Sequence, residues 1–460
     1  MTEEIIIETL SRKAEGQAEY HNAKVLIPHT IPGDKVLAKL YKKRKGIIKG
    51  RLEQILIPSK DRVELRCPHA EICGGCMIQA MDYQKQLQQK EKWVLDQFQS
   101  HIFEDHGEIY PIVSLEIPWE FRNKMEFSFS QNGIGTKYLG LMIAKANRFV
   151  FNLSNCFLAS SFFAKLVVRV REFWENSDYT AYNYENDTGL FLTLTVREGK
   201  NTSEKMVVLT INGKEEFAVN DQALFIKAVQ EVIGNNPEKV SIILRKRIIE
   251  EKSPTSFEEI VLFGKDTIQE VLNIQVDDQK IPLTFNISAT SFFQPSTCQA
   301  EKLYSTALSL LQDMAPIDVA YDLYSGTGTL AMIFSKAAKN VIGIELNPDA
   351  VEDAKKNALQ NGIENVQFIA GDVGKILQST SLPKPDLVIV DPPRAGLDDL
   401  AIAKLLQLMP EKIIYISCNV LTQEKNYLEL KKAGYKIKKM IPLDQFPHTY
   451  HIENIALLER

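Results

Sequence analysis

The sequence predicts an α/β protein whose C-terminal region, from about residue 286, forms a mostly parallel, doubly wound sheet. Near-continuous Val/Ile runs alternate there with helical segments, which is typical of strands that helices bury on both faces. Glycine-rich or polar segments follow several of these runs, at the strand ends where ligands bind in such sheets. The expected strands are 318–323, 341–345, 366–369, 387–390, 412–417, 436–441 and 452–458.

Two further regions are expected before this sheet. Residues 1–59 alternate short apolar runs with turns, such as Ile-Pro-Gly-Asp at 31–34, which predicts a small β-barrel. Residues 60–285 begin with a cysteine-bearing segment, continue with an expected helix at 80–103, and contain strand-like runs at 190–196, 206–211 and 240–244. This pattern predicts a central α+β region, and the third region is then 286–460.

Composition and charge bound the class of protein. A chain of 460 residues suits two or three domains. No apolar run approaches the roughly 20 residues that cross a bilayer, and the acidic start lacks a signal-peptide pattern, so we expect a cytoplasmic, monomeric protein. The net charge is −5, but eight Lys/Arg and no Asp or Glu lie between Lys35 and Arg51. This basic strip is either a solvated face or a phosphate-contacting surface.

A glycine turn follows the first strand of the C-terminal sheet. Gly326 and Gly328 fit a cofactor-binding turn, but they also fit a plain tight turn between a strand and a helix. With Ala331 in the third glycine position, they also fit a nicotinamide site. The segment Asp391-Pro-Pro-Arg394, after the fourth strand, favours S-adenosylmethionine because it is rare in dehydrogenases. Glu345 ends the second strand and can accept both hydroxyls of a ribose, and Asp372 after the third strand suits an adenine contact.

A cysteine and a carboxylate complete the chemistry of this region. Cys418 ends a buried strand, where it is either a small packing residue or a nucleophile beside the cofactor. Methylation of a pyrimidine C5 needs such a thiol, because C5 is a poor nucleophile until a thiolate adds to C6. A base must afterwards remove the C5 proton. Glu453 is the candidate, and its plainer interpretation is an ordinary strand-end carboxylate.

The remaining cysteines suggest a metal site. Six cysteines are too few for a disulfide scaffold of this length, and in a reducing cytoplasm they are better interpreted as ligands or nucleophiles. Cys67, Cys73 and Cys76 are closely spaced around two glycines, and Cys156 follows 80 residues later. Four thiolates suit zinc or an iron–sulfur cluster, and the spacing leaves both open beside scattered structural cysteines. Cys298 is expected to be a packing residue.

Taken in order, these motifs resemble those of the bacterial RNA uracil-5 methyltransferases. The shared segments are Ser-Phe-Phe-Gln-Pro at 291–295, the glycine turn, Asp391-Pro-Pro-Arg394, Ser417-Cys418-Asn419 and the segment 444–453. The resemblance implies Cys418 as the nucleophile, Glu453 as the base that takes the C5 proton, and Asp391 beside the methyl donor and the uracil. The residues expected on S-adenosylmethionine are Gln294, Tyr324, Thr329, Glu345, Asp372 and Asp391.

The segment from Cys67 to Gln79 resembles the [4Fe–4S] site of the 23S rRNA branch of this family, which also carries an N-terminal TRAM barrel similar to residues 1–57. The resemblance implies a cluster held by Cys67, Cys73, Cys76 and Cys156, an RNA-binding barrel, and 23S rRNA as the partner. The implied fold is a Rossmann-like methyltransferase domain with a TRAM (OB-like) barrel and a central α+β region that bears the iron–sulfur site.

Ser296 and Ala80 depart from the family pattern, where Asn and His are usual, and they weaken the assignment to one particular nucleotide. Two alternatives remain. One is a transfer-RNA uracil-5 methyltransferase. The other is a non-catalytic RNA-binding factor of ribosome assembly, against which the intact Cys418, Asp391 and Glu453 argue.

Overall fold

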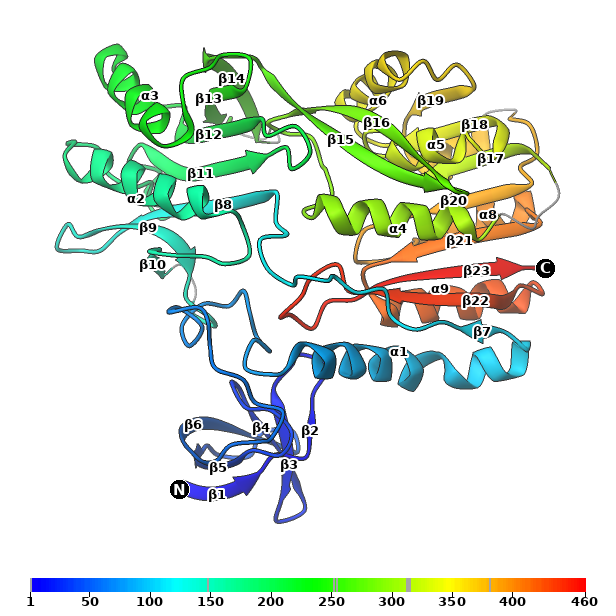
Figure 1. The fold of residues 1–460 in the computed structure, drawn as a ribbon, viewed down its shortest axis with the longest axis horizontal. Coiled ribbons are helices and arrows are strands. Elements are labelled where there is room, and N and C mark those ends of the chain that lie inside the picture. The colour runs from blue at the N-terminus through cyan, green and yellow to red at the C-terminus, as the bar shows by residue number, and fades with distance from the viewer. Residues whose placement is uncertain (1, 147–148, 251–252, 254, 312–315, 380–381) are drawn as a thin grey trace.

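The C-terminal region is built around one eight-stranded sheet (Figure 1). The computed structural model describes residues 2–146, 149–250, 253, 255–311, 316–379 and 382–460. All seven predicted strands of this region are confirmed to within a few residues. They are β17 (Ile317–Leu323), β18 (Ala338–Glu345), β19 (Val366–Ala370), β20 (Leu387–Val390), β21 (Lys412–Ser417), β22 (Lys436–Leu443) and β23 (Glu453–Glu459).

The strand order of the sheet is β19-β18-β17-β20-β21-β23-β22-β7. Strands β17 to β21 are parallel, and β23 runs antiparallel between β21 and β22. The chain leaves β17 toward β18 and β19 on one side and returns to β20 on the other, which creates a switch point where open α/β sheets bind their ligands. The predicted α/β class is confirmed.

Helices cover both faces of this sheet, and the apolar side chains of each face form a separate core. One face carries α4 (Thr297–Ser309), α5 (Thr329–Phe334) and α6 (Pro348–Gln360). The other face carries α1 (Tyr83–Asp105), α7 (Val373–Ser379), α8 (Asp399–Leu408) and α9 (Val420–Lys432).

Helix α1 comes from the middle region of the sequence but packs on the C-terminal sheet, below β22 in Figure 1. The helix predicted at 80–103 is confirmed, and Asp82 caps it by accepting the backbone N–H groups of Gln84 and Lys85. At its other end, Asp105 accepts the Tyr427 hydroxyl and the Ile437 N–H. The short strand β7 (Glu108–Ile109), which the sequence did not predict, then pairs in parallel with β22.

A seven-stranded sheet forms the central region, in the order β10-β9-β8-β11-β12-β13-β14. Its strands are β8 (Lys124–Gln131), β9 (Lys137–Met142), β10 (Val150–Asn152), β11 (Phe191–Glu198), β12 (Lys205–Asn212), β13 (Val240–Ile248) and β14 (Ser256–Phe263). The three predicted runs became β11, β12 and β13. Helices α2 (Ser161–Glu175) and α3 (Val219–Ile233) share an apolar core with one face of this sheet.

A long hairpin connects the central and C-terminal regions (Figure 1). Its strands, β15 (Thr267–Val276) and β16 (Gln279–Ser288), form a separate two-stranded sheet. The hairpin packs against α4, and the backbone of β16 is fastened to α6 because Asn286 N–H donates to the Asn357 side chain. The loop that follows β16 carries Gln294 and is therefore held between the two regions.

The N-terminal strands form a curved six-stranded sheet around a small core of their own. They are β1 (Thr2–Ile6), β2 (Thr9–Leu10), β3 (Gly16–Tyr20), β4 (Ala23–Ile27), β5 (Lys35–Leu40) and β6 (Ile47–Ile57). The predicted turn at 31–34 lies between β4 and β5, where the Asp34 carboxylate accepts the Ile31 N–H at 2.8 Å. Its assignment as a TRAM barrel stays a prediction.

No helix in the described part of the chain is long and apolar enough to cross a membrane. The cytoplasmic location expected from the sequence stays a prediction.

Candidate active site

The carboxyl ends of adjacent parallel strands gather the predicted site residues. Leu323 of β17 pairs with Val390 of β20, so Tyr324 and Asp391, the next residue of each strand, end side by side. Strand β21 lies next to β20, and Cys418 follows its last residue, Ser417. Tyr324, Asp391 and Cys418 therefore share one edge of the sheet, at the switch point between β17 and β20.

Cys418 and Glu453 are opposed across two antiparallel strands. Ser417 of β21 pairs with Asn454 of β23, and the next position outward on each strand is Cys418 and Glu453. Glu453 is buried, and Cys418 is partly exposed. Because β23 is antiparallel to β21, its first residue lies at the carboxyl end of β21. The Glu453 carboxylate is therefore placed beside the Cys418 thiol.

The charges around Cys418 act in opposite directions on its pKa. Burial raises the pKa of the thiol to about 11, and the charge of Glu453 adds to this shift, whereas the Arg394 guanidinium, which hydrogen-bonds the thiol, lowers it. Arg394 also lies 3.4 Å from His451 Nδ1. Burial and the Arg394 charge lower the pKa of His451 to about 4, so the imidazole is neutral at pH 7 and adds no second positive charge beside Arg394.

Buried carboxylates accumulate beside the thiol. Burial raises the pKa values of Asp322, Asp391 and Glu453, and repulsion among these carboxylates adds to the shift at Asp322 and Glu453. One oxygen of Asp322 accepts the Ala331 N–H at 2.8 Å, and the other has no hydrogen-bond partner among the described residues. A positively charged ligand would relieve this repulsion, and a sulfonium such as that of S-adenosylmethionine carries such a charge.

The glycine turn has a backbone that few residues could adopt. Gly328 has a φ of 79°, and a Cβ there would lie 2.5 Å from Cζ of Phe368. Tyr324 has a φ of 67°, which is uncommon for a residue with a side chain and often marks a functional site. The Glu345 carboxylate accepts the Gly326 N–H at 2.9 Å, so the residue expected to hold a ribose also holds the turn. Thr329 begins α5 directly after this turn.

Gln294 is fixed by contacts that the sequence did not reveal. The Gln445 side chain donates to Gln294 Oε1 at 3.1 Å, and Asn123 Nδ2 donates to the Gln294 backbone carbonyl at 2.9 Å. The motif at 444–453 contained Gln445, but only the fold reveals that it meets the 291–295 segment. Asp372 caps α7 by accepting the Lys375 N–H at 3.0 Å, and its charge reaches Tyr324.

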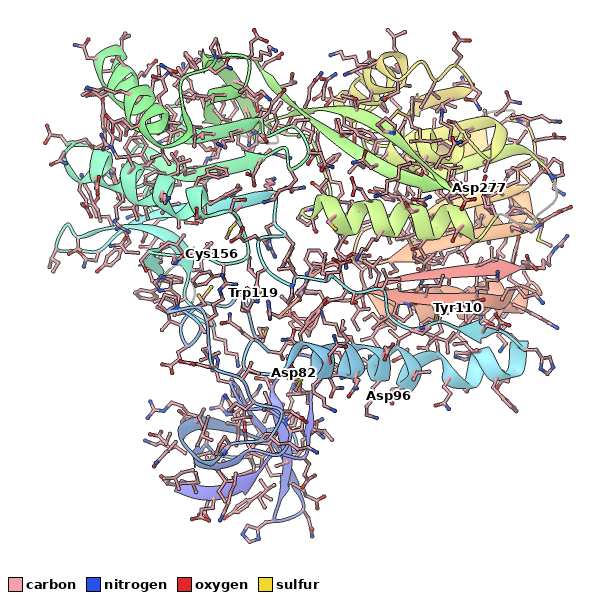
Figure 2. The ribbon with its side chains drawn as sticks, in the orientation of Figure 1. Asp82, Asp96, Tyr110, Trp119, Cys156 and Asp277 are labelled. Carbon is pink, nitrogen blue, oxygen red and sulfur yellow. The ribbon has the colours of Figure 1, made fainter. Side chains whose placement is uncertain are left out.

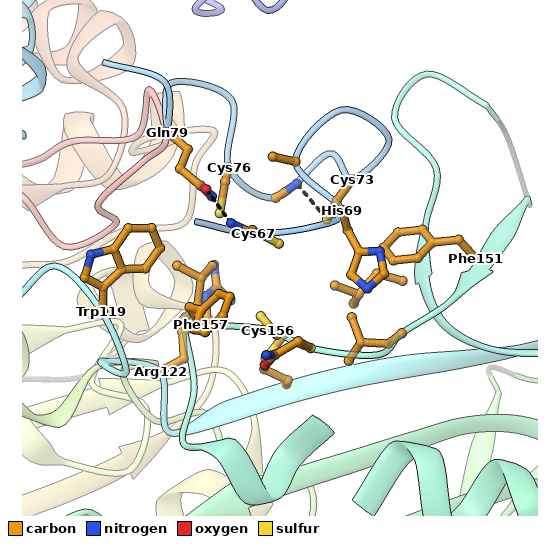
Figure 3. Close-up of a pocket in the computed structure, with 17 residues that line it drawn as sticks. Cys67, His69, Cys73, Cys76, Gln79, Trp119, Arg122, Phe151, Cys156 and Phe157 are labelled. Carbon is orange, nitrogen blue, oxygen red and sulfur yellow. Dashed lines mark hydrogen bonds between the residues drawn. The ribbon is translucent and has the colours of Figure 1, made fainter. Parts of the chain in front are cut away.

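The four predicted cysteine ligands line one cavity of about 130 Å³ (Figure 3). Cys67, Cys73 and Cys76 come from the segment before α1, and Cys156 comes from the loop after β10. The Gly75 N–H donates to Cys73 Sγ at 3.4 Å. The Cys67 N–H donates to the Gln79 side chain at 3.0 Å.

Burial raises the pKa of every thiol in this cavity, most strongly at Cys76, where the other cysteines add repulsion. Arg122 lies close enough to interact with Cys73, Cys76 and Cys156, and its Nε has no partner among the described residues. One guanidinium cannot balance four thiolates. The donor set therefore fits a group that brings positive charge, although no His/Cys/Asp/Glu group in the described ranges converges as a metal-ion site.

The cysteine cavity adjoins the segment that precedes Glu453. Figure 2 labels Cys156 and Trp119 in the space where the central region approaches Asp82 at the start of α1. Trp119 lines the cavity and stacks on His448 with ring centroids 4.0 Å apart. The Ile78 N–H also donates to the His448 carbonyl at 3.0 Å. Cys298, in contrast, is exposed, and the expectation that it is a packing residue is wrong because its position on α4 faces away from the core.

Comparisons with known proteins agree with this architecture. The chain is 43% identical over 440 residues to an RNA methyltransferase of Protochlamydia amoebophila, covering 94% of this chain and 99% of the relative. It is 35% identical to one of Clostridium acetobutylicum, covering 100% and 98%. The crystal structure of Pyrococcus abyssi tRNA (uracil-54, C5)-methyltransferase in complex with S-adenosyl-L-homocysteine is similar with a TM-score of 0.74 and 25% identity, covering 99% of this chain and 100% of that chain.

The fold and the site thus define an α/β methyltransferase. The family model described as tRNA (Uracil-5-)-methyltransferase matches residues 214–460. The chain belongs to this family of RNA uracil-5 methyltransferases.

Proposed function

We propose that the protein transfers a methyl group from S-adenosylmethionine to C5 of a uridine in RNA, through a covalent adduct between Cys418 and C6. The observation that carries this proposal is the opposition of Cys418 and Glu453 at the ends of β21 and β23. A nucleophile and a base placed this close can act on adjacent atoms, C6 and C5, of one pyrimidine ring.

The residues account for each bond that changes. The Cys418 thiolate forms a bond to C6, and the electron pair of the C5–C6 double bond moves toward C5. S-adenosylmethionine, when bound, would supply the methyl group to C5 as its S–CH3 bond breaks, and S-adenosylhomocysteine would be the leaving group. Glu453 removes the C5 proton, the double bond re-forms, and the C6–S bond breaks. Arg394 favours the thiolate, while the raised pKa of Glu453 makes its carboxylate a stronger base.

The cofactor residues proposed from the sequence lie on one sheet edge or on the loop beside it. Asp391 and Tyr324 end neighbouring strands, and Glu345 follows the paired Leu323 and Ile344 on β18. The S-adenosyl-L-homocysteine complex of the Pyrococcus abyssi protein supports a similar donor here. The residues proposed to hold S-adenosylmethionine are Gln294, Tyr324, Thr329, Glu345, Asp372 and Asp391.

We propose that Cys67, Cys73, Cys76 and Cys156 hold a [4Fe–4S] cluster. A single zinc ion would draw sulfurs to about 2.3 Å from one point, whereas four irons spread the thiolates around a larger core. The 130 Å³ cavity that all four cysteines line supports the larger group. The proposed division of the chain is an RNA-binding TRAM-like barrel at 1–59, the iron–sulfur segment and central domain at 60–285, and the methyltransferase domain at 286–460.

The proposed substrate is 23S rRNA, which a cytoplasmic monomer would modify. The cysteine segment and the six-stranded N-terminal sheet support this branch of the family. A second candidate, transfer RNA, is favoured by the similarity to the Pyrococcus abyssi tRNA methyltransferase.

A deletion strain tests the proposed function. We expect one or more 5-methyluridines to be lost from its 23S rRNA, restored by the wild-type chain and not by Cys418→Ala. Loss from transfer RNA alone would select the second candidate. Loss from neither RNA, together with no transfer of a tritiated methyl group to unmodified RNA, would instead support a non-catalytic role.

A further inference from the structure

Basic side chains gather on the face of the central sheet that α2 and α3 leave uncovered. Arg197 of β11 lies opposite Lys124 of β8 in the strand register. Arg245 and Arg247 are two residues apart on β13, so they lie on the same face. Their strand neighbours Met125, Val196 and Leu244 point into the apolar core with the two helices. Because side chains alternate between faces, the four cations lie on the opposite face. We call Lys124, Arg197, Arg245 and Arg247 the basic sheet face.

These guanidinium groups carry more N–H donors than the described residues around them supply acceptors. Nitrogens of Arg197, Arg245 and Arg247 are buried without a hydrogen-bond partner among the described residues. Arg197 is only 3% exposed, and burial and the charge of Arg245 lower the pKa of Arg197. A buried donor left unpaired destabilises the fold unless a ligand satisfies it.

The acidic side chains described on this face satisfy only part of these donors. The Glu259 carboxylate accepts a hydrogen bond from Arg245 Nε at 2.9 Å. Glu126 accepts the Thr195 hydroxyl and lies near Lys124. Asp187 accepts from Lys214 and Tyr182, and its charge also reaches Arg247. Within the described ranges, several guanidinium donors of this face therefore lack an acceptor, and an external anion could supply one.

Aromatic rings lie beside the same guanidinium groups. The Arg247 guanidinium lies 4.1 Å from the centre of the Tyr182 ring and 5.5 Å from that of Tyr184. Arg245 lies 5.6 Å from the Phe257 ring. Tyr184 is 60% exposed and Phe257 is 48% exposed. Cations next to exposed rings suit a nucleic-acid strand, because its phosphates pair with arginine and its bases stack on aromatic rings.

The basic sheet face runs directly into the catalytic site. Arg197 Nη2 donates to the Ser291 carbonyl, at the start of the loop that ends in Gln294. Asn123, the residue before Lys124, donates to the Gln294 carbonyl. We propose that Arg245 and Arg247, with Lys124, bind backbone phosphates of the RNA strand that presents its uridine to Cys418, while the buried Arg197 positions the loop that carries Gln294. This inference rests on the proposed function, and the site is separate from the basic strip of the N-terminal sheet.

Binding measurements with a non-reactive enzyme test this proposal. In a Cys418→Ala background, Arg245→Gln/Arg247→Gln should bind single-stranded substrate RNA at least about fivefold more weakly. Its slope of log K against log salt should fall by about 0.7 for each phosphate that the variant no longer neutralises. Lys165→Gln/Lys227→Gln is the matched control, since these exposed lysines lie on α2 and α3, over the other face, and remove the same charge. The control should change neither quantity.

The charge-conserving variant Arg245→Lys/Arg247→Lys should keep the salt slope and lose part of the affinity, because lysine lacks the planar fork of arginine. If the glutamine variant does not fold, the loss of affinity in this lysine variant tests the proposal instead. Unchanged affinity and slope in a folded glutamine variant, or equal losses in the control, would overturn the proposal. Since binding is measured without methyl transfer, failure of the proposed function, with RNA bound but no 5-methyluridine formed by wild-type protein, is a distinct result.

Discussion

Lys90 and Asp444 form an ion pair of 2.5 Å in which both side chains are fully buried. Lys90 lies on α1, and Asp444 directly precedes Gln445, the residue that holds Gln294. Tyr83, also on α1, donates its hydroxyl to the second Asp444 oxygen at 2.9 Å. Helix α1 therefore fixes the segment between β22 and β23 from outside the methyltransferase region.

Replacing Lys90 should lower the free energy of unfolding. Lys90→Met leaves Asp444 buried without its countercharge, and breaking a buried pair in this way costs about 3–5 kcal/mol. Lys92→Met is the control, because Lys92 pairs with Asp96 at the helix surface and should lose less than about 1 kcal/mol. Urea unfolding measures both. Similar losses in the two variants would show that the buried pair has no special weight.

Glu453 and Arg394 should have opposite effects on the reactivity of the Cys418 thiol. Alkylation by iodoacetamide requires the thiolate, so its rate on the Cys418 peptide should rise toward pH 11 in the free enzyme. Glu453→Gln removes a negative charge and should move the inflection to lower pH. Arg394→Met removes a positive charge and should move it to higher pH. Shifts in the same direction would contradict the assigned electrostatics.

A fluorinated substrate should trap the adduct. Fluorine at C5 cannot leave as a cation, so RNA with 5-fluorouridine at the target, together with S-adenosylmethionine, should give a protein–RNA complex that survives denaturing electrophoresis. Cys418→Ala should form none. Glu453→Gln should trap a similar complex with ordinary uridine, because an amide is a very poor base. A complex that persists in Cys418→Ala would assign the nucleophile to another residue, with the exposed Cys298 tested first.

Anaerobically purified protein should be brown and contain iron and sulfide at about four each per chain, as [4Fe–4S] stoichiometry requires. Cys76→Ser should lose most of both, whereas Cys298→Ser should keep them, because Cys298 lies outside the cavity. Metal and sulfide analysis provide the measurement. Stoichiometric zinc without iron would contradict the cluster.

Within the basic strip, the loop between β5 and β6 should contribute most to RNA affinity. Lys42, Lys43, Arg44 and Lys45 are exposed, and neutralising all four should weaken RNA binding and flatten its salt dependence, since fewer counterions are released. Turnover at saturating RNA should change little.

A comparison variant neutralises Lys35, Lys49 and Arg51, which pair with Glu4, Glu15 and Glu53; because it removes three charges and not four, the effects are compared per charge removed. Filter binding across salt concentrations should show a smaller effect in this variant. No effect in either variant would identify the strip as a solvated face.

The sequence predicted the C-terminal sheet well because its strands are long, apolar and bounded by turns. It also predicted that Cys418 and Glu453 act together, and the pairing of β21 with β23 places them opposite each other. It could not predict β7, since two residues carry no periodic signal. The apolar side chains of α1 indicated a buried face but not the sheet that covers it. The contact of Gln445 with Gln294 joins positions 151 residues apart, and no local pattern encodes it.

The placement of α1 and β7 has a consequence for how this protein can fold. Lys90 and Asp444 are 354 residues apart, so the C-terminal sheet is completed by a segment far away in the chain, a topology that slows folding. A fragment of residues 286–460 would lack that segment. Its β22 would become an open edge strand, and apolar side chains such as Met440 would lose their cover, which favours aggregation. The region that carries the chemistry is therefore expected to be less stable alone than within the full chain.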